Sequence, residues 1–138
     1  MQEVKDTQRA SVRIGYDGRV HKTFRGPDAP ARFANETRVL RYLEQKNCPF
    51  VPRLLAADPS DLSIVTTNCG QRVTQIGDEK LKGLFEELES YGVKHDDPFM
   101  RNVTYNAREG RFCLIDFEFA TILEDSADNT LQSGESRK

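Results

Sequence analysis

The chain has 138 residues, enough for one domain with a hydrophobic core but short for an enzyme built from two full lobes. Charged residues make up 30% of it and the formal net charge is −2, which argues against a nucleic-acid-binding domain or a strongly membrane-attracted one. No apolar run approaches the roughly 20 residues that span a bilayer. The three cysteines form no Cys-x-x-Cys pair, so they indicate reduced thiols and a cytoplasmic protein.

The N-terminal part of the chain predicts a β-hairpin. Residues 1–10 are polar and are expected to form a flexible lead-in. Residues 11–14 and 19–24 alternate between apolar and polar side chains, as strands do, on either side of Gly15-Tyr16-Asp17-Gly18. An Asp-Gly pair between such segments is a hairpin signal. A phosphate-cradling glycine loop is the alternative, but its last glycine would lie only four residues before Lys22, which leaves no room for an intervening strand.

A lysine and a glutamate stand at positions where apolar residues are expected. Lys22 shares a strand face with Val20 and Phe24, so its ammonium either reaches water at the end of a packed stem or serves a site. A helix is predicted over residues 28–46, with Asp28 as its capping residue. Glu36 falls within the apolar stripe of that helix, which is made by Ala29, Phe33, Leu40 and Leu43. A carboxylate turned toward a core is costly unless it is paired, so Glu36 needs a partner.

The rest of the chain completes an α+β fold. Strands are predicted over residues 50–57 and 62–67, and a hairpin is predicted over residues 103–115. Between them a helix begins at Asp78 and ends near Gly92, with an apolar face formed by Leu81, Leu84, Phe85, Leu88 and Tyr91. We expect a small antiparallel sheet with a packed helix, then a helix and a hairpin, in a single domain over residues 11–124. Residues 125–138 are polar and are expected to be disordered.

The clearest functional signal is the loop His95-Asp96-Asp97-Pro98-Phe99-Met100-Arg101-Asn102, followed by Ile115-Asp116-Phe117-Glu118 at the end of an apolar strand. Asn102 and Asp116 bring oxygen ligands from neighbouring segments beside Asp97, which suits a hard Mg²⁺ ion that also holds phosphate oxygens. Taken singly, each of these residues is also ordinary: Asp97 and Asn102 suit a turn after a helix, and Asp116 suits the end of a strand.

The spacing His-x-Asp-x-x-x-x-Asn followed by Asp-Phe-x resembles the catalytic loop and metal-binding strand of the protein-kinase-like superfamily, with a likeness over roughly residues 11–122. The resemblance implies that Asp97 is the catalytic base and that Asn102 and Asp116 hold Mg²⁺. It also implies that Lys22 forms an ion pair with Glu36 and contacts the phosphates of ATP as a second catalytic residue. Val20 would then cover the nucleotide base.

Other positions match the superfamily or depart from it. His95 is expected to support the loop by hydrogen bonding, and Asn68-Cys69-Gly70 resembles the hinge whose backbone binds an adenine edge. Phe99 stands where many relatives place a lysine or histidine, although Arg101 is a nearby cation. Glu118 replaces the glycine of Asp-Phe-Gly. The glycine-rich loop and most of the helical lobe are missing, so the implied fold is a reduced one.

The implied function is an ATP- and Mg²⁺-dependent kinase that phosphorylates itself or a Ser/Thr hydroxyl of a protein. A partner chain or self-association would supply the grip on the substrate. Two alternatives stay open. One is a pseudokinase-like scaffold that binds nucleotide without transferring phosphate. The other is a small-molecule kinase, because Gly92-Val93-x-His95-x-Asp97 also resembles aminoglycoside and lipopolysaccharide kinase loops.

Overall fold

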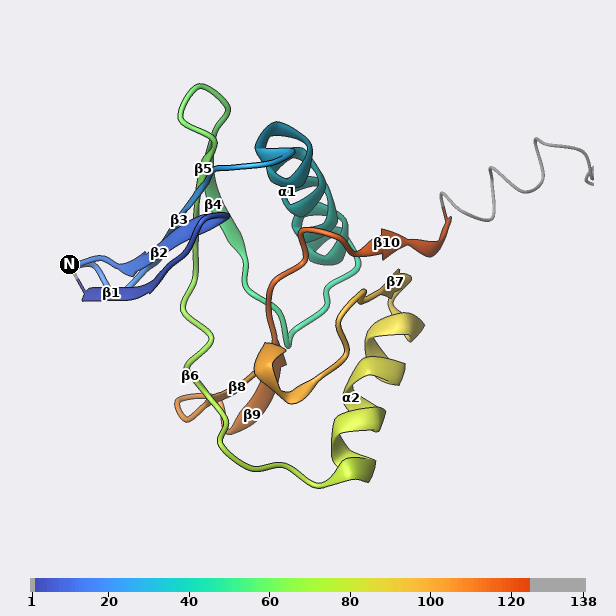
Figure 1. Cartoon of the computed structure of the whole chain (residues 1–138). Coiled ribbons are helices and arrows are strands. Elements are labelled where there is room, and N and C mark those ends of the chain that lie inside the picture. The colour runs from blue at the N-terminus through green and yellow to red at the C-terminus, as the bar shows by residue number, and fades with distance from the viewer. Residues whose placement is uncertain (1, 125–138) are drawn as a thin grey trace, which may run out of the picture.

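The computed structural model describes residues 2–124, and the first half of them forms a five-stranded antiparallel sheet with a helix beside it (Figure 1). The strands lie in the order β1-β2-β3-β5-β4. Their bounds are β1 Gln2–Asp6, β2 Ala10–Ile14, β3 Val20–Phe24, β4 Leu54–Asp58 and β5 Ser63–Thr66. The predicted hairpin is confirmed, because β2 and β3 pair antiparallel with Ile14 opposite Val20.

Strand β1 lies where the sequence suggested a flexible lead-in over residues 1–10. Residues 2–6 instead pair with β2 at the edge of the sheet. Val4 is the only apolar residue of the strand, so no alternating pattern announces it. Its place in the sheet follows from its backbone pairing with β2. Residues 7–9 are therefore a short turn between two paired strands.

The first helix, α1, spans Ala29–Gln45 and packs against β3, β4 and β5. The predicted stripe is confirmed, since Phe33, Leu40 and Leu43 are buried and Glu36 is buried with them. The expected cap is wrong. Asp28 occupies the N-cap position in a left-handed conformation with φ of 59° and makes no side-chain cap hydrogen bond. A capping side chain normally needs the extended backbone that lets it reach the N–H groups of the first turn.

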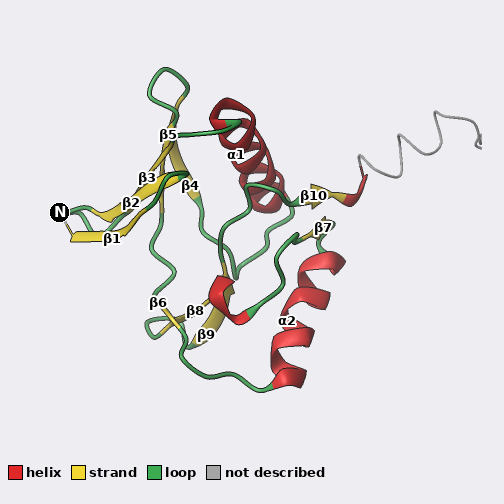
Figure 2. Ribbon diagram, in the orientation of Figure 1, coloured by secondary structure: helices red, strands yellow, loops and turns green. Residues whose placement is uncertain are grey.

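The second half of the described residues contains a second helix and short paired strands joined by long loops (Figure 2). Helix α2 spans Asp78–Ser90 and buries Leu84, Phe85 and Leu88. One sheet has the order β6-β8-β9, and β7 pairs with β10. The bounds are β6 Gln71–Arg72, β7 Val93–Lys94, β8 Val103–Asn106, β9 Arg111–Leu114 and β10 Thr121–Ile122, with a 3₁₀ turn, η1, at Met100–Asn102.

One hydrophobic core joins the two halves. It contains Leu40 and Leu43 from α1, Leu88 from α2, Leu114 from β9, and Phe117 just beyond β9. The α+β architecture expected from the sequence, with small antiparallel sheets and two α-helices, is confirmed for residues 2–124. Neither of these helices is long and apolar enough to cross a membrane. The tail expected over residues 125–138 lies outside the described residues.

Candidate functional site

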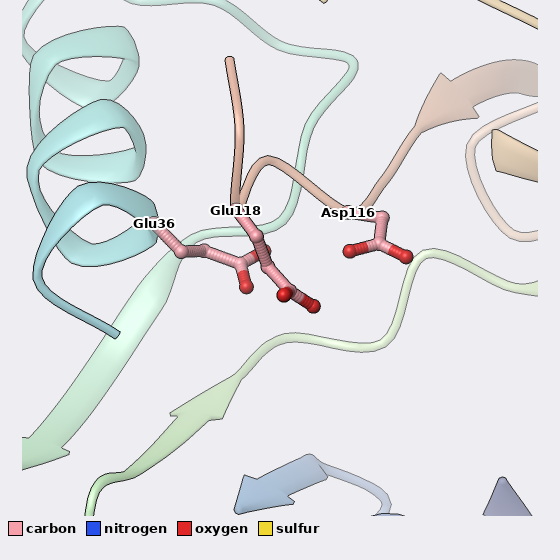
Figure 3. Close-up of side chains that lie close together, drawn as sticks. All are labelled: Glu36, Asp116 and Glu118. Atoms are coloured by element: carbon pink, nitrogen blue, oxygen red, sulfur yellow. The ribbon is translucent and has the colours of Figure 1, made fainter. Parts of the chain in front are cut away.

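A buried lysine surrounded by three carboxylates is the centre of the site. The Nζ atom of Lys22, on β3, lies 2.8 Å from Glu36 Oε1, 2.8 Å from Glu118 Oε2 and 3.3 Å from Asp116 Oδ1. The predicted ion pair between Lys22 and Glu36 is therefore confirmed. Figure 3 shows the three carboxylates converging on one space, Glu36 from α1 and the other two from the segment after β9.

The surroundings of Lys22 keep it charged. Burial alone would lower the pKa of its ammonium, but attraction to Glu36 first, and then to Asp116 and Glu118, raises the pKa above its ordinary value. The cluster thus holds a fixed positive charge between negative ones at neutral pH.

One face of α1 ties the helix to the segment that carries Asp116. Arg32 Nη1 lies 2.9 Å from Glu118 Oε1, and Asn35 Nδ2 donates to the backbone oxygens of Glu118 and Ala120, each at 2.9 Å. The second oxygen of Glu36 accepts the N–H of Phe117 at 3.0 Å. Positions 32, 35 and 36 share a helix face because they are three and four residues apart. The helix therefore fixes the backbone on both sides of Phe117.

Asp116 itself has an uncommon backbone conformation. Its φ is 72°, in the left-handed region that a non-glycine residue seldom adopts. Two hydrogen bonds hold the preceding residue, Ile115. Its N–H donates to Asn102 O at 3.0 Å, and its carbonyl oxygen accepts a hydrogen bond from His95 Nε2 at 2.9 Å. Such conformations persist only where neighbouring contacts impose them, and they concentrate at functional sites.

His95 is a structural support of the loop, as the sequence indicated. Its Nδ1 accepts the N–H of Asp97 at 3.0 Å, so the proton of the neutral ring lies on Nε2, which donates to Ile115 O at 2.9 Å. The buried ring packs against Phe85 and Phe117, with centroids 5.3 and 5.2 Å away. His95 therefore joins the Asp97 loop to the strand that precedes Asp116.

Asp97 is held by two neighbours in its own loop. Arg101 donates from Nε at 2.7 Å and from Nη2 at 2.6 Å, a bidentate contact with both carboxylate oxygens, and Asn102 Nδ2 donates at 2.9 Å. The hydrogen bonds from Arg101 lower the pKa of Asp97; burial opposes them, and the charge of Arg101 and the Asn102 bond lower the pKa further. The amide nitrogen of Asn102 is used by Asp97, which leaves its Oδ1 as the atom that suits a cation.

Two cavities meet at Asp116. The first, of about 440 Å³, has an apolar wall and a charged end; among its lining residues are Val12, Ile14, Val20, Lys22, Glu36, Leu40, Ile64, Asn68, Cys69, Gly70 and Ile115. The second, of about 330 Å³, is lined by Thr7, Arg9, Asp96, Asp97, Asn102, Asp116, Glu118 and Phe119. The structure thus brings Val20, Lys22 and Glu36 to one cavity and Asp97 and Asn102 to the other, with Asp116 bordering both.

The donor set of the second cavity fits a hard cation. Asn102 and Asp116 offer amide and carboxylate oxygens, and Glu118 adds a further carboxylate that lies within 4.8 Å of those of Glu36 and Asp116. Oxygen ligands of this kind suit Mg²⁺, which keeps several waters and is completed by substrate phosphates.

Several site residues were not predicted from the sequence. Arg32 and Asn35 lie one helical turn and one residue before Glu36, so helical spacing is the signal that would have found them. Glu118 was noted only as a departure, whereas it accepts hydrogen bonds from both Lys22 and Arg32. Arg9 was assigned to the lead-in, and only the pairing of β1 with β2 brings it to the second cavity.

The chain matches no protein-family model and no curated protein. The chemistry of the two cavities is therefore argued from the arrangement of their own residues.

Proposed function

We propose that the protein is an ATP- and Mg²⁺-dependent phosphotransferase with a reduced protein-kinase-like fold, and that its acceptor is a hydroxyl of a protein or of a second copy of the chain. The observation that carries the proposal is Lys22, fixed by Glu36 at 2.8 Å, at the charged end of an apolar cavity that meets an oxygen-lined cavity at Asp116. The three free cysteines favour a reducing compartment, so we include the cytoplasm in the proposal.

The two cavities suggest how an ATP molecule would be divided between them. The adenosine part fits the apolar wall, to which the neighbouring strands β3 and β5 contribute Val20 and Ile64, and residues Asn68–Gly70 border it. The triphosphate would then run past Lys22 toward Asp116. Because phosphates carry several negative charges, the ammonium of Lys22 and a cation held by Asp116 and Asn102 supply the opposite charge.

Asp97 is the group that we assign to the acceptor. In phosphoryl transfer a carboxylate orients the attacking hydroxyl and takes its proton, while Mg²⁺ supplies charge neutralisation on the phosphates. Asp97 borders the second cavity and, with its pKa lowered, is ionised at neutral pH, as that role requires. Glu118 brings an extra negative charge to the phosphate side, and Arg32 at 2.9 Å offsets it.

A nucleotide-binding scaffold is the second candidate, and one observation favours it. Asp97 is occupied by the bidentate contact with Arg101, and Lys22 already has three carboxylate partners. Transfer requires both residues to exchange these partners for substrate. A scaffold requires only that Lys22 does so.

Transfer of labelled γ-phosphate from ATP tests the proposal. Wild type, Asp97→Asn and the surface control Asp61→Asn are compared at saturating ATP and Mg²⁺, first alone and then with a mixed protein substrate. We expect Asp97→Asn to slow transfer by ~10²–10⁴-fold, because help from a positioned base is lost. Calorimetry should give the same ATP affinity for all three proteins.

Three outcomes are informative. Equal label incorporation by wild type and Asp97→Asn contradicts the assigned role of Asp97. Mg²⁺-dependent ATP binding without incorporation into any acceptor favours the scaffold. Transfer only to added amino alcohols or sugars, and not to protein, identifies a small-molecule kinase.

A further inference from the structure

The turn between β1 and β2, residues 7–9, borders the second cavity. Thr7 and Arg9 line that cavity together with Asp97, Asn102 and Asp116. In the strand order β1-β2-β3-β5-β4, this turn lies next to the strand pair that carries Lys22. It therefore borders the place where the proposed function puts the terminal phosphates.

The backbone of this turn is poorly suited to hold a phosphate. Thr7 N–H donates to Ala10 O at 2.8 Å, and the N–H groups of Arg9 and Ala10 both donate to Thr7 Oγ1 at 3.2 Å. The turn contains no glycine. Loops that cradle phosphate do so with free N–H groups, which usually requires glycine. The contribution of this turn to an anion must come from a side chain.

Arg9 is the cation available for that role. Its backbone oxygen accepts hydrogen bonds from Arg25 N–H at 2.8 Å and from Arg32 Nη1 at 3.4 Å, so its main chain is tied to the residue after β3 and to α1. Its guanidinium lies over the ring of Phe119, 5.7 Å from the centroid, at the cavity wall. This aromatic contact limits the orientations of a long side chain and leaves its N–H groups able to donate.

Three other cations near the site already have carboxylate partners. Lys22 contacts Glu36, Asp116 and Glu118 in one cluster, Arg32 contacts Glu118, and Arg101 contacts Asp97. Among residues 7–124, by contrast, no carboxylate lies within ion-pair distance of the Arg9 guanidinium. An arginine at the rim of a cavity with metal-type ligands can therefore take an added anion without breaking an existing ion pair.

We propose that Arg9 binds the terminal phosphates of the nucleotide, so that the β1–β2 turn grips the polyphosphate with a guanidinium instead of backbone N–H groups. The inference rests on the proposed function for the identity of the ligand. Arginine suits phosphate because its planar donors bind two oxygens at once. The contribution of Arg9 to binding affinity should then increase with the number of phosphates on the ligand, while the affinity for the nucleoside alone should not depend on Arg9.

The test compares wild type, Arg9→Gln and Arg9→Lys, with Arg13→Gln as the control. Arg13 is an exposed arginine on β2 that lines neither cavity. Isothermal titration with MgATP, MgADP and adenosine gives the affinities. A charge-assisted contact predicts roughly tenfold to hundredfold weaker MgATP binding for Arg9→Gln. We expect a smaller loss for MgADP, unchanged adenosine affinity, partial recovery in Arg9→Lys and wild-type values for Arg13→Gln.

Wild-type MgATP affinity in Arg9→Gln, or an equal loss for adenosine and MgATP, overturns the role of Arg9. Inorganic tripolyphosphate with Mg²⁺ separates this inference from the proposed function. If wild type binds tripolyphosphate through Arg9 but does not bind ATP, the proposed function fails and the anion site stands. If wild type binds ATP and Arg9→Gln binds it equally well, only the anion site fails. If wild type binds neither ligand, both fail.

Discussion

Replacing Lys22 by methionine should destabilise the fold in a way that depends on pH. The change removes the cation that three carboxylates share, while a side chain of similar length still fills the space. The carboxylates of Glu36, Asp116 and Glu118 have oxygens within 4.8 Å of one another. At that separation two charges repel by about 3 kcal/mol when the effective dielectric constant is near 20.

The expected loss at pH 7 is about 3–5 kcal/mol, the range for removing one partner of a buried ion pair. The cluster can relieve its repulsion by binding a proton, because nearby like charges raise carboxyl pKa values. A carboxyl with a folded-state pKa above its unfolded-state pKa destabilises the fold at high pH, and this effect fades as the pH falls toward the unfolded-state value. Lys22→Met should therefore lose less stability at pH 5 than at pH 7.

Urea unfolding followed by circular dichroism at both pH values measures the effect. Lys82→Met is the matched control, because it makes the same chemical change at a surface pair, where Lys82 is 78% exposed and 3.9 Å from Glu86. Exposed pairs of this type contribute within about 0.5 kcal/mol. A Lys22→Met variant as stable as Lys82→Met at pH 7, or one with equal losses at pH 7 and pH 5, would refute the reasoning.

Two further substitutions test the geometry around the cavities. Arg101→Met should return the lowered pKa of Asp97 toward its ordinary value. In the wild type, ionised Asp97 contributes stability that is lost as the pH falls through its lowered pKa, so the variant should lose less stability in acid. Carbon-13 NMR titration of the Asp97 carboxyl measures the pKa, and the same pKa in both proteins would show that the contact is absent in solution. Gly70→Ala should lower the free energy of unfolding by at least about 2 kcal/mol, since Gly70 has φ of +94° and an added Cβ would lie 2.0 Å from Tyr105 O. Gly83→Ala in α2 should raise the free energy of unfolding by up to about 1 kcal/mol, because an added Cβ there has nothing within 4 Å. The midpoints of thermal unfolding of the two glycine variants should shift in opposite directions. Shifts of the same sign would contradict the crowding expected at Gly70 or the open space expected at Gly83.

Periodicity in the sequence was sufficient for the main elements and for the central charge pair. Glu36 stands out because a carboxylate interrupts an apolar stripe, and its burial confirms that the anomaly was informative. The helix boundaries followed from the same stripe. The helix cap could not be predicted in this way, because the left-handed conformation of Asp28 depends on the path of the loop after β3 and is not encoded in the residue type.

The rest of the site depends on contacts that the local sequence does not record. Strand β1 has one apolar residue, so the turn carrying Arg9 could not be placed next to Asp116 before the sheet order was known. Glu118 looked like an unfavourable substitution because its partner Arg32 lies 86 residues away along the chain. The strands β6, β7 and β10 have two residues each, which is too few to show an alternation of apolar and polar side chains, so only their pairing with other strands defines them.

The cluster around Lys22 joins segments that are far apart in the chain. The contact with Glu118 spans 96 residues and the contact with Asp116 spans 94. Closing loops of this length costs conformational entropy before the contact contributes, so these ion pairs should form late in folding, after α1 has packed on the sheet. Lys22 and Glu36 are only 14 residues apart, so a chain emerging from the ribosome can pair them with one another early. Their contacts with Phe117 and Glu118 would follow only after the segment beyond β9 had been synthesised, and the second cavity would form with that segment.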